Sequence, residues 1–199
     1  MGRAKATLPI DGRDTFLSKI VRTFLEAGVD DVVVVLGHEA EAIATSLSSS
    51  GPDGVRARFA FNPHYDRGQL SSLLAGRSVV DRPGVRAVLM TLVDVPLVSP
   101  ATVRAVVNRY LTSGAPIVRP VNGERHGHPL LIDRSLFSAL RGADPLAGAK
   151  PLVRAYASAA GDVAVVDEGA FTDIDTVEEY ERLISADAAA GRARCRDDP

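Results

Sequence analysis

Three aspartates occupy positions at which a carboxylate can take part in chemistry. Asp94 directly follows the apolar run of residues 88–93, and a charge at the end of a buried strand must be solvated, paired or bound to a metal. Asp173 and Asp175 are two residues apart, so in an extended segment both carboxylates face the same side. Because one or two carboxylates and substrate phosphates are the usual ligands of Mg²⁺, these three residues are candidate metal ligands.

Two of these carboxylates also have a purely local alternative role. Asp94 could cap the turn that follows it, and Asp175 could help to cap the final helix. Thr176 and Glu179 form a capping-box pattern at the start of that helix. The spacing of the residues leaves both alternatives open.

A glycine followed by small polar residues marks a possible anion site. Gly68 is followed by Gln69, Ser71 and Ser72 at the predicted start of a helix. Main-chain N–H groups and hydroxyls at a helix start favour a bound anion. Ordinary helix capping explains the same residues equally well.

His128 and Lys5 are two further candidate binding residues. His128 lies in a loop between two short strand candidates, close to His126. Because no cysteine or third histidine is nearby, a substrate-binding or structural histidine is favoured over a zinc ligand. Lys5 could pair with a phosphate, or it could be a solvated surface charge.

The elements that must position these residues alternate between helical and extended periods, which is typical of an α/β domain with a mostly parallel sheet. Such sheets bind ligands at the carboxyl ends of their strands. Helices are predicted over residues 17–25, with Asp14 as the capping residue, and over 39–47, 69–80, 100–111, 135–140, 151–157 and 177–190. Strands are predicted over residues 31–36, 55–61, 87–93, 117–120, 129–132 and 163–166.

Length and composition narrow the class of protein. The 199 residues are 46% hydrophobic and 24% charged, which is a globular composition that suits a single domain. We expect this domain to cover residues 1–190, followed by a flexible tail over 191–199. The formal charge of −2 does not favour nucleic acid as a partner.

The same sequence predicts a cytoplasmic location. The single cysteine, Cys195, excludes an internal disulfide and suits a reducing compartment. The longest apolar run, residues 32–36, is far shorter than the roughly 20 residues that cross a bilayer. The amino end lacks the apolar core of a signal peptide, so neither export nor a membrane partner is expected.

Five segments of the sequence carry recognisable motifs. These segments are residues 1–9, 68–73 (Gly-Gln-Leu-Ser-Ser-Leu), 92–97 (Leu-Val-Asp-Val-Pro-Leu), 127–129 (Gly-His-Pro) and 173–180. In the same order, they resemble motifs of the MobA-like nucleotidyltransferases and most closely those of the molybdenum cofactor cytidylyltransferases. The resemblance implies a Rossmann-like nucleotide-diphospho-sugar transferase (GT-A-like) fold, a three-layer αβα sandwich.

The resemblance also implies an activity, which is the transfer of CMP or GMP from CTP or GTP to molybdopterin, with release of pyrophosphate. Mg²⁺ or Mn²⁺ would bind Asp94, Asp175 and Asp173, and Lys5 would neutralise the departing pyrophosphate. The acceptor side of the cleft would be lined by Gln69, Ser71, Ser72 and His128. The attacking group is already a phosphate anion, so no general base is assigned.

The sequence departs from the family pattern at its start. The family's first strand and its L-A-A-G-x-S-x-R loop would precede Met1, and Ala4 replaces the usual proline. The expectation is a sheet without its first strand and a chain that binds nucleotide poorly, unless the true start lies upstream. An alternative function follows, namely a non-catalytic protein that binds molybdenum cofactor and delivers it to a molybdenum hydroxylase. A third possibility keeps the fold but changes the phosphorylated acceptor.

Overall fold

The structure is a computed structural model that describes residues 4–48 and 57–194, with side chains as far as residue 185. Its helices are α1 (Phe16–Glu26), α2 (Ala40–Ser48), α3 (Gln69–Val80), α4 (Pro100–Ser113), α5 (Phe137–Arg141), α6 (Lys150–Tyr156) and α7 (Val177–Arg194). Its strands are β1 (Val33–Leu36), β2 (Arg58–Phe61), β3 (Ala87–Met90), β4 (Ile117–Asn122), β5 (Arg125–His126), β6 (Leu130–Asp133) and β7 (Asp162–Ala164). Short 3-10 turns are η1 (Lys5–Thr7), η2 (Tyr65–Arg67), η3 (Arg134–Leu136) and η4 (Glu168–Phe171).

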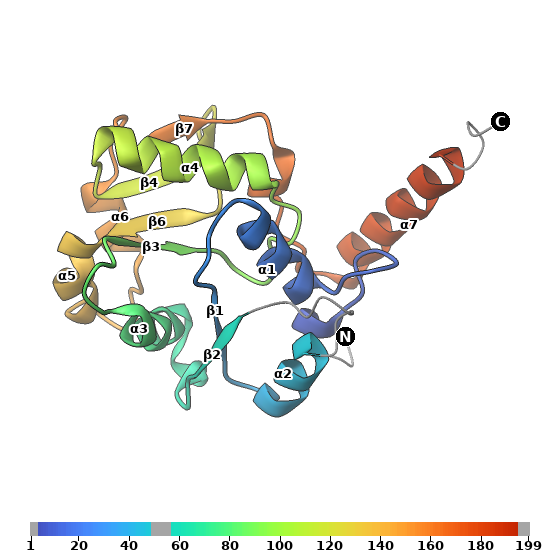
Figure 1. Cartoon of the computed structure of the whole chain (residues 1–199), viewed down its shortest axis with the longest axis horizontal. Coiled ribbons are helices and arrows are strands. Elements are labelled where there is room, and N and C mark those ends of the chain that lie inside the picture. The colour runs from blue at the N-terminus through green and yellow to red at the C-terminus, as the bar shows by residue number, and fades with distance from the viewer. Residues whose placement is uncertain (1–3, 49–56, 195–199) are drawn as a thin grey trace.

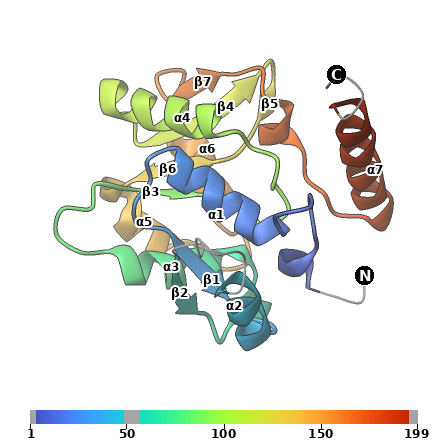
Figure 2. The ribbon, with the colours of Figure 1, turned by 45° about the vertical axis from the view of Figure 1, so that its right-hand side comes forward.

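The elements form three layers, as predicted, with the strands between two layers of helices (Figure 1). On one face, α4 packs through Val106 on Val118 of β4 and Leu131 of β6. On the opposite face, Leu73 of α3 and Leu152 of α6 belong to a cluster centred on β4 and β6. Helix α7 leads away from these layers in both views (Figure 2). No helix within residues 4–48 and 57–194 is long and apolar enough to cross a membrane.

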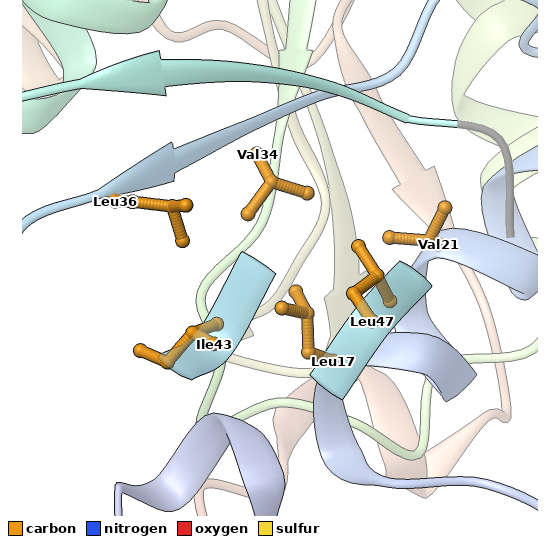
Figure 3. Packing of buried hydrophobic residues seen from close by; sticks show 6 residues of the cluster. All are labelled: Leu17, Val21, Val34, Leu36, Ile43 and Leu47. Atoms are coloured by element: carbon orange, nitrogen blue, oxygen red, sulfur yellow. The ribbon is translucent and has the colours of Figure 1, made fainter. Parts of the chain in front are cut away.

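The amino-terminal half has its own core around β1 (Figure 3). The amphipathic spacing that predicts the first helix places its apolar side chains toward β1, and α2 adds two side chains to the same cluster. Burial of these side chains holds both helices against one face of β1. The six buried residues are Leu17 and Val21 of α1, Val34 and Leu36 of β1, and Ile43 and Leu47 of α2.

The sheet is mostly parallel in direction, although three of its five pairings in the described ranges are antiparallel. Strands β1 and β2 are parallel, as are β4 and β7. Strands β3 and β4 both run antiparallel to β6, so they run parallel to each other. The antiparallel β6 and the short β5, which forms a hairpin with β4, depart from a purely parallel pattern.

The sheet is also interrupted between β1 and β3. Strands β1 and β2 form a two-stranded unit, and the other strands form a separate five-stranded unit. Asp31, just before β1, pairs with Arg82, just before β3, so the amino ends of the two strands lie at one edge. Both strands therefore run in the same direction, with a gap at the position of one strand.

Several predicted boundaries shift for local reasons. Thr15, and not Asp14, caps α1, because the Thr15 side chain and Ser18 form a capping box. Asp14 instead accepts hydrogen bonds from Arg22 and Ser18. Strand β3 ends at Met90, where its pairing with β6 ends, although the apolar sequence continues to Val93.

At the carboxyl end of the chain, the last helix continues to Arg194, so residues 191–194 are helical. The rest of the expected flexible tail, residues 195–199, lies outside the described residues. So does the first part of the predicted strand over 55–61.

Candidate functional site

The loop after β3 and the segment before α7 meet at the carboxyl edge of the sheet. The main-chain N–H of Ile174 donates a 2.8 Å hydrogen bond to the main-chain oxygen of Asp94. Ile174 is only 2% exposed, whereas its neighbours Asp173 and Asp175 are exposed. The alternation of buried and exposed residues is the one predicted for an extended segment with both carboxylates on one side.

Lys5 enters the same place from the opposite end of the chain. Its Nζ lies 2.8 Å from Oδ1 of Asp175. The hydroxyl of Tyr180, in the first turn of α7, donates to the main-chain oxygen of Pro9 at 2.9 Å and ties the two chain ends together. The structure therefore brings together Lys5 and the three candidate aspartates, which are up to 170 residues apart in sequence.

The surroundings of Asp94 oppose the ionisation of its carboxyl group. Burial raises the pKa of its carboxyl group, the negative charges of Asp173 and Asp175 raise it further, and Lys5 opposes them. Its Oδ1 is buried and accepts no hydrogen bond from residues 4–48 or 57–194. A buried carboxylate oxygen without a partner costs free energy, and a bound cation removes that cost.

His128 is fixed next to these aspartates by the Gly-His-Pro segment. Its main-chain N–H donates to the oxygen of Ala170 at 2.8 Å. A Cβ at Gly127 would lie 2.3 Å from the same oxygen, so only glycine allows this close approach.

Burial lowers the pKa of His128, against the opposing effects of Asp173, the Met90 main chain and Asp94. The Nδ1 atom of His128 is buried and has no hydrogen-bond partner among the residues that the structure describes. The site therefore contains a neutral imidazole with one ring nitrogen that none of these residues contacts through a hydrogen bond.

The three polar residues at the start of α3 have different roles. The hydroxyl of Ser71 contacts the main-chain oxygens of His64 and Gly68, both at 2.8 Å, so it serves to hold the helix start. Gln69 and Ser72 line the same cavity as Asp94. The capping alternative thus describes Ser71, while Gln69 and Ser72 remain candidate binding residues.

Sequence reasoning missed Asn62. Its buried side chain donates to Ser71 Oγ at 2.8 Å and to Ser72 Oγ at 3.1 Å. Asn62 directly follows β2, so the rule that polar residues after strands form the site could have found it.

The aspartates do not form a ready-made cage for a metal. Within residues 4–48 and 57–194, no group of three or more His, Cys, Asp or Glu side chains is arranged to hold an ion. Asp175 is paired with Lys5, and the assignment of Asp94, Asp173 and Asp175 as metal ligands stays a prediction. The residues still fit Mg²⁺ or Mn²⁺, because the free oxygen of Asp94 together with substrate phosphates is the kind of ligand set these ions use.

Solved structures share this fold. The chain is similar to Rv0371c of Mycobacterium tuberculosis H37Rv, with 26% identity over 93% of this chain and 90% of that one and a TM-score of 0.71. A manganese complex of Rv0371c matches with 25% identity, 92% and 93% coverage and a TM-score of 0.69. Molybdopterin-guanine dinucleotide biosynthesis protein A of Archaeoglobus fulgidus matches with 16% identity, 94% and 92% coverage and a TM-score of 0.64, which shows the fold alone.

No curated protein matches the sequence. The family model of the MobA-like NTP transferase domain matches residues 1–161. This range contains Lys5, Asp94 and His128, whereas Asp173 and Asp175 lie beyond it. Because the match covers most of the chain, the protein belongs to the MobA-like NTP transferase family.

Proposed function

We propose that this protein transfers a nucleotidyl group, CMP or GMP, from CTP or GTP to the terminal phosphate of molybdopterin. The family supports nucleotidyl transfer in general, and the sequence motifs favour molybdopterin as the acceptor. The observation that carries the proposal is the buried, unpartnered Oδ1 of Asp94, which lies near Lys5 at the carboxyl edge of the sheet.

The aspartates and Lys5 would have different roles in this reaction. Asp94 with Asp173 or Asp175 would hold the divalent ion, which neutralises charge on the triphosphate when it is bound. Lys5 would exchange its partner Asp175 for the pyrophosphate that leaves. Since the attacking phosphate is already an anion, the site needs charge and positioning more than a base.

His128 would take part on the acceptor side. Because burial keeps its imidazole neutral near pH 7, its unprotonated ring nitrogen can accept a hydrogen bond from an N–H group of the pterin without adding charge. Gln69 and Ser72 would line the same cleft, while Asn62 positions Ser72 through its side-chain amide.

Release of pyrophosphate tests this proposal. CTP and GTP are each supplied with Mg²⁺ and molybdopterin, and the protein is compared with its Asp94→Asn and Asp30→Asn variants. Asp30 is an exposed aspartate before β1 and serves as the matched control. We expect Asp94→Asn to lower turnover by about 100-fold and Asp30→Asn to leave it unchanged. Equal turnover in all three proteins would remove Asp94 from the mechanism.

A second candidate function is a non-catalytic protein that binds molybdenum cofactor and delivers it to a molybdenum hydroxylase. The interruption of the sheet beside the site and the engagement of Lys5 by Asp175 favour this candidate. Calorimetry separates the two functions, since the second requires molybdopterin binding with neither CTP nor GTP consumed. The pterin would be a ligand in both cases.

A further inference from the structure

Tyr65 is an exposed aromatic residue in the wall of the cavity that contains Asp94. It lies in η2, between β2 and α3, and is 45% exposed. Its side chain lines the same cavity as Gln69 and Ser72. Small-molecule sites are commonly lined by aromatic side chains together with a few polar groups, so Tyr65 is a candidate ligand contact.

The other aromatic residues that line this cavity, Phe24 and Tyr110, have different roles. Phe24 is buried and packs in the core with Ile20. Tyr110 donates its hydroxyl to Oδ2 of Asp133. Among the described residues, Tyr65 is therefore the aromatic side chain of the cavity that is left exposed to a ligand.

The loop after β1 holds the base of the Tyr65 side chain. A Cβ at Gly37 would lie 2.4 Å from Cβ, 2.6 Å from Cγ and 2.8 Å from Cδ1 of Tyr65, so this close approach requires glycine. The ring of His38 follows, with its centroid 5.9 Å from that of Tyr65 and an angle of 49° between the ring planes. Glu39 has a φ of 53°, which is uncommon for a residue other than glycine. The loop thus adopts a constrained conformation next to Tyr65.

The main chain around Tyr65 is held by residues that also organise the start of α3. The side-chain oxygen of Asn62 accepts a 2.9 Å hydrogen bond from the main-chain N–H of His64, and Ser71 Oγ contacts the main-chain oxygen of His64 at 2.8 Å. The N–H of Gly68 donates to the main-chain oxygen of Tyr65 at 3.3 Å. The ring therefore stands on a fixed turn directly before α3, and such preorganisation lowers the cost of binding.

We propose that Tyr65 stacks on a planar heteroaromatic ring of a substrate, either the pterin of the acceptor or the base of the nucleotide. Aromatic side chains bind planar rings through their faces, whatever the groups on the edge of the ring. Gln69 and Ser72 lie in the same cavity and would supply polar contacts to that edge. The inference rests on the proposed function and adds a substrate-binding residue to the same site.

Calorimetric titration of the chain with CTP, GTP and molybdopterin, each with Mg²⁺, tests this inference without a measurement of turnover. Inorganic triphosphate is the fourth ligand, because it carries the charges of the nucleotides without a ring. We expect Tyr65→Leu to weaken the binding of a ring-bearing ligand by about tenfold and to leave the affinity for triphosphate unchanged. Leucine keeps a Cβ, a Cγ and a Cδ1, the atoms that approach Gly37 most closely, so the packing of the loop is retained.

The pattern of losses identifies the stacked ring. A loss confined to molybdopterin assigns the platform to the pterin, and a loss confined to CTP and GTP assigns it to the base. In NMR spectra, the ring-proton signals of Tyr65, assigned by their loss in Tyr65→Leu, should move to higher field when that ligand binds. A residue with a purely structural role would not show this ring-current shift.

Two variants serve as controls. Tyr65→Phe keeps the aromatic ring and should bind each ligand with nearly the wild-type affinity. Phe59→Leu removes another exposed ring, which is 41% exposed and does not line the cavity, and it should leave all four affinities unchanged.

Four outcomes would overturn the inference. If Tyr65→Leu binds every ring-bearing ligand as tightly as the wild type, Tyr65 does not stack, although the proposed function stands. If the affinity for triphosphate falls to the same extent, Tyr65 shapes the site without contacting a ring. If Tyr65→Phe binds as weakly as Tyr65→Leu, the hydroxyl group is the contact. If the wild type binds none of CTP, GTP and molybdopterin, the proposed function fails together with the inference.

Discussion

The main-chain oxygen of Asp94 accepts a 2.8 Å hydrogen bond from the main-chain nitrogen of Ile174. This contact joins the loop after β3 to the segment before α7 and sets Asp173 and Asp175 beside Asp94. Ile174 itself is buried in a cluster with Leu8 and Phe16. The hydrophobic anchor and the carboxylates therefore belong to one three-residue segment, which couples the packing of the core to the placement of charge.

Truncation of this anchor is expected to destabilise the protein. Ile174→Ala removes a side chain that is 2% exposed, which costs about 3 kcal/mol of unfolding free energy through lost burial and a cavity. Val166→Ala, at a position that is 95% exposed, is the control and should change stability by less than about 0.5 kcal/mol. Urea unfolding measures both changes. Similar small effects at the two positions would show that Ile174 is not an anchor.

Because Gly127 lies close to Ala170, substitution of this glycine is expected to destabilise the protein. In Gly127→Ala the new Cβ would lie 2.3 Å from the Ala170 oxygen, so the Gly-His-Pro segment must move, at a cost of about 1–3 kcal/mol. Gly12→Ala introduces a Cβ with no atom within 4 Å and should be nearly neutral. Thermal unfolding of the two variants side by side decides the matter. A Gly127→Ala protein as stable as Gly12→Ala would show that the Gly-His-Pro segment can accommodate a Cβ without a loss of stability.

The imidazole of His128 is expected to titrate below its usual range. Burial is the main cause of its lowered pKa, and the negative charge of Asp94 partly opposes it. Asp94→Asn should therefore lower the pKa of His128 further. Because the folded state resists the proton that the unfolded state takes up, stability falls as the pH drops below about 6.5. NMR titration measures the shift, and the His128 signal is assigned by its loss in His128→Gln. A higher pKa of His128 in Asp94→Asn would contradict this expectation.

A pH-dependent contribution to stability is expected from Asp167. Burial alone would raise the pKa of this carboxyl group, but hydrogen bonds from Thr102 and Ser99 outweigh it and lower the pKa. The Thr102 and Ser99 hydroxyls lie 2.6 Å and 2.7 Å from Oδ2.

Asp167→Asn should therefore cost about 2 kcal/mol at neutral pH. Because the folded pKa is depressed, this difference is fully present above the unfolded pKa of about 3.9 and is lost as the pH falls through the folded value. Urea unfolding from pH 7 to pH 2.5, with Asp30→Asn as the control, tests the sign. A difference that grows with acidity would contradict it.

Local signals in the sequence predicted much of the framework. Helix α3 has the predicted bounds, and Ser99 with Pro100 begins α4 as expected. The capping box of Thr176 and Glu179 forms as well, with hydrogen bonds in both directions. These features depend on residues within one turn of each other, which is why a single sequence reveals them.

Such local signals do not predict features that depend on contacts between distant parts of the chain. The end of β3 is set by the length of β6 and not by the apolar run that continues to Val93. The contact of Lys5 with Asp175 joins positions 170 residues apart, so nothing local predicts that the two charges neutralise each other. The role of Asn62 depends on how α3 lies against β2, which is likewise a matter of tertiary packing.

Binding of Mn²⁺ in the presence of CTP or GTP tests most directly whether Asp94 is the centre of a metal-nucleotide site. Electron paramagnetic resonance gives the affinity for the wild-type protein, Asp94→Asn and the control Asp30→Asn. We expect Asp94→Asn to bind the ion about tenfold more weakly or worse, because its free carboxylate oxygen is replaced by an amide, and Asp30→Asn to match the wild type. Equal affinity in all three proteins would contradict the account.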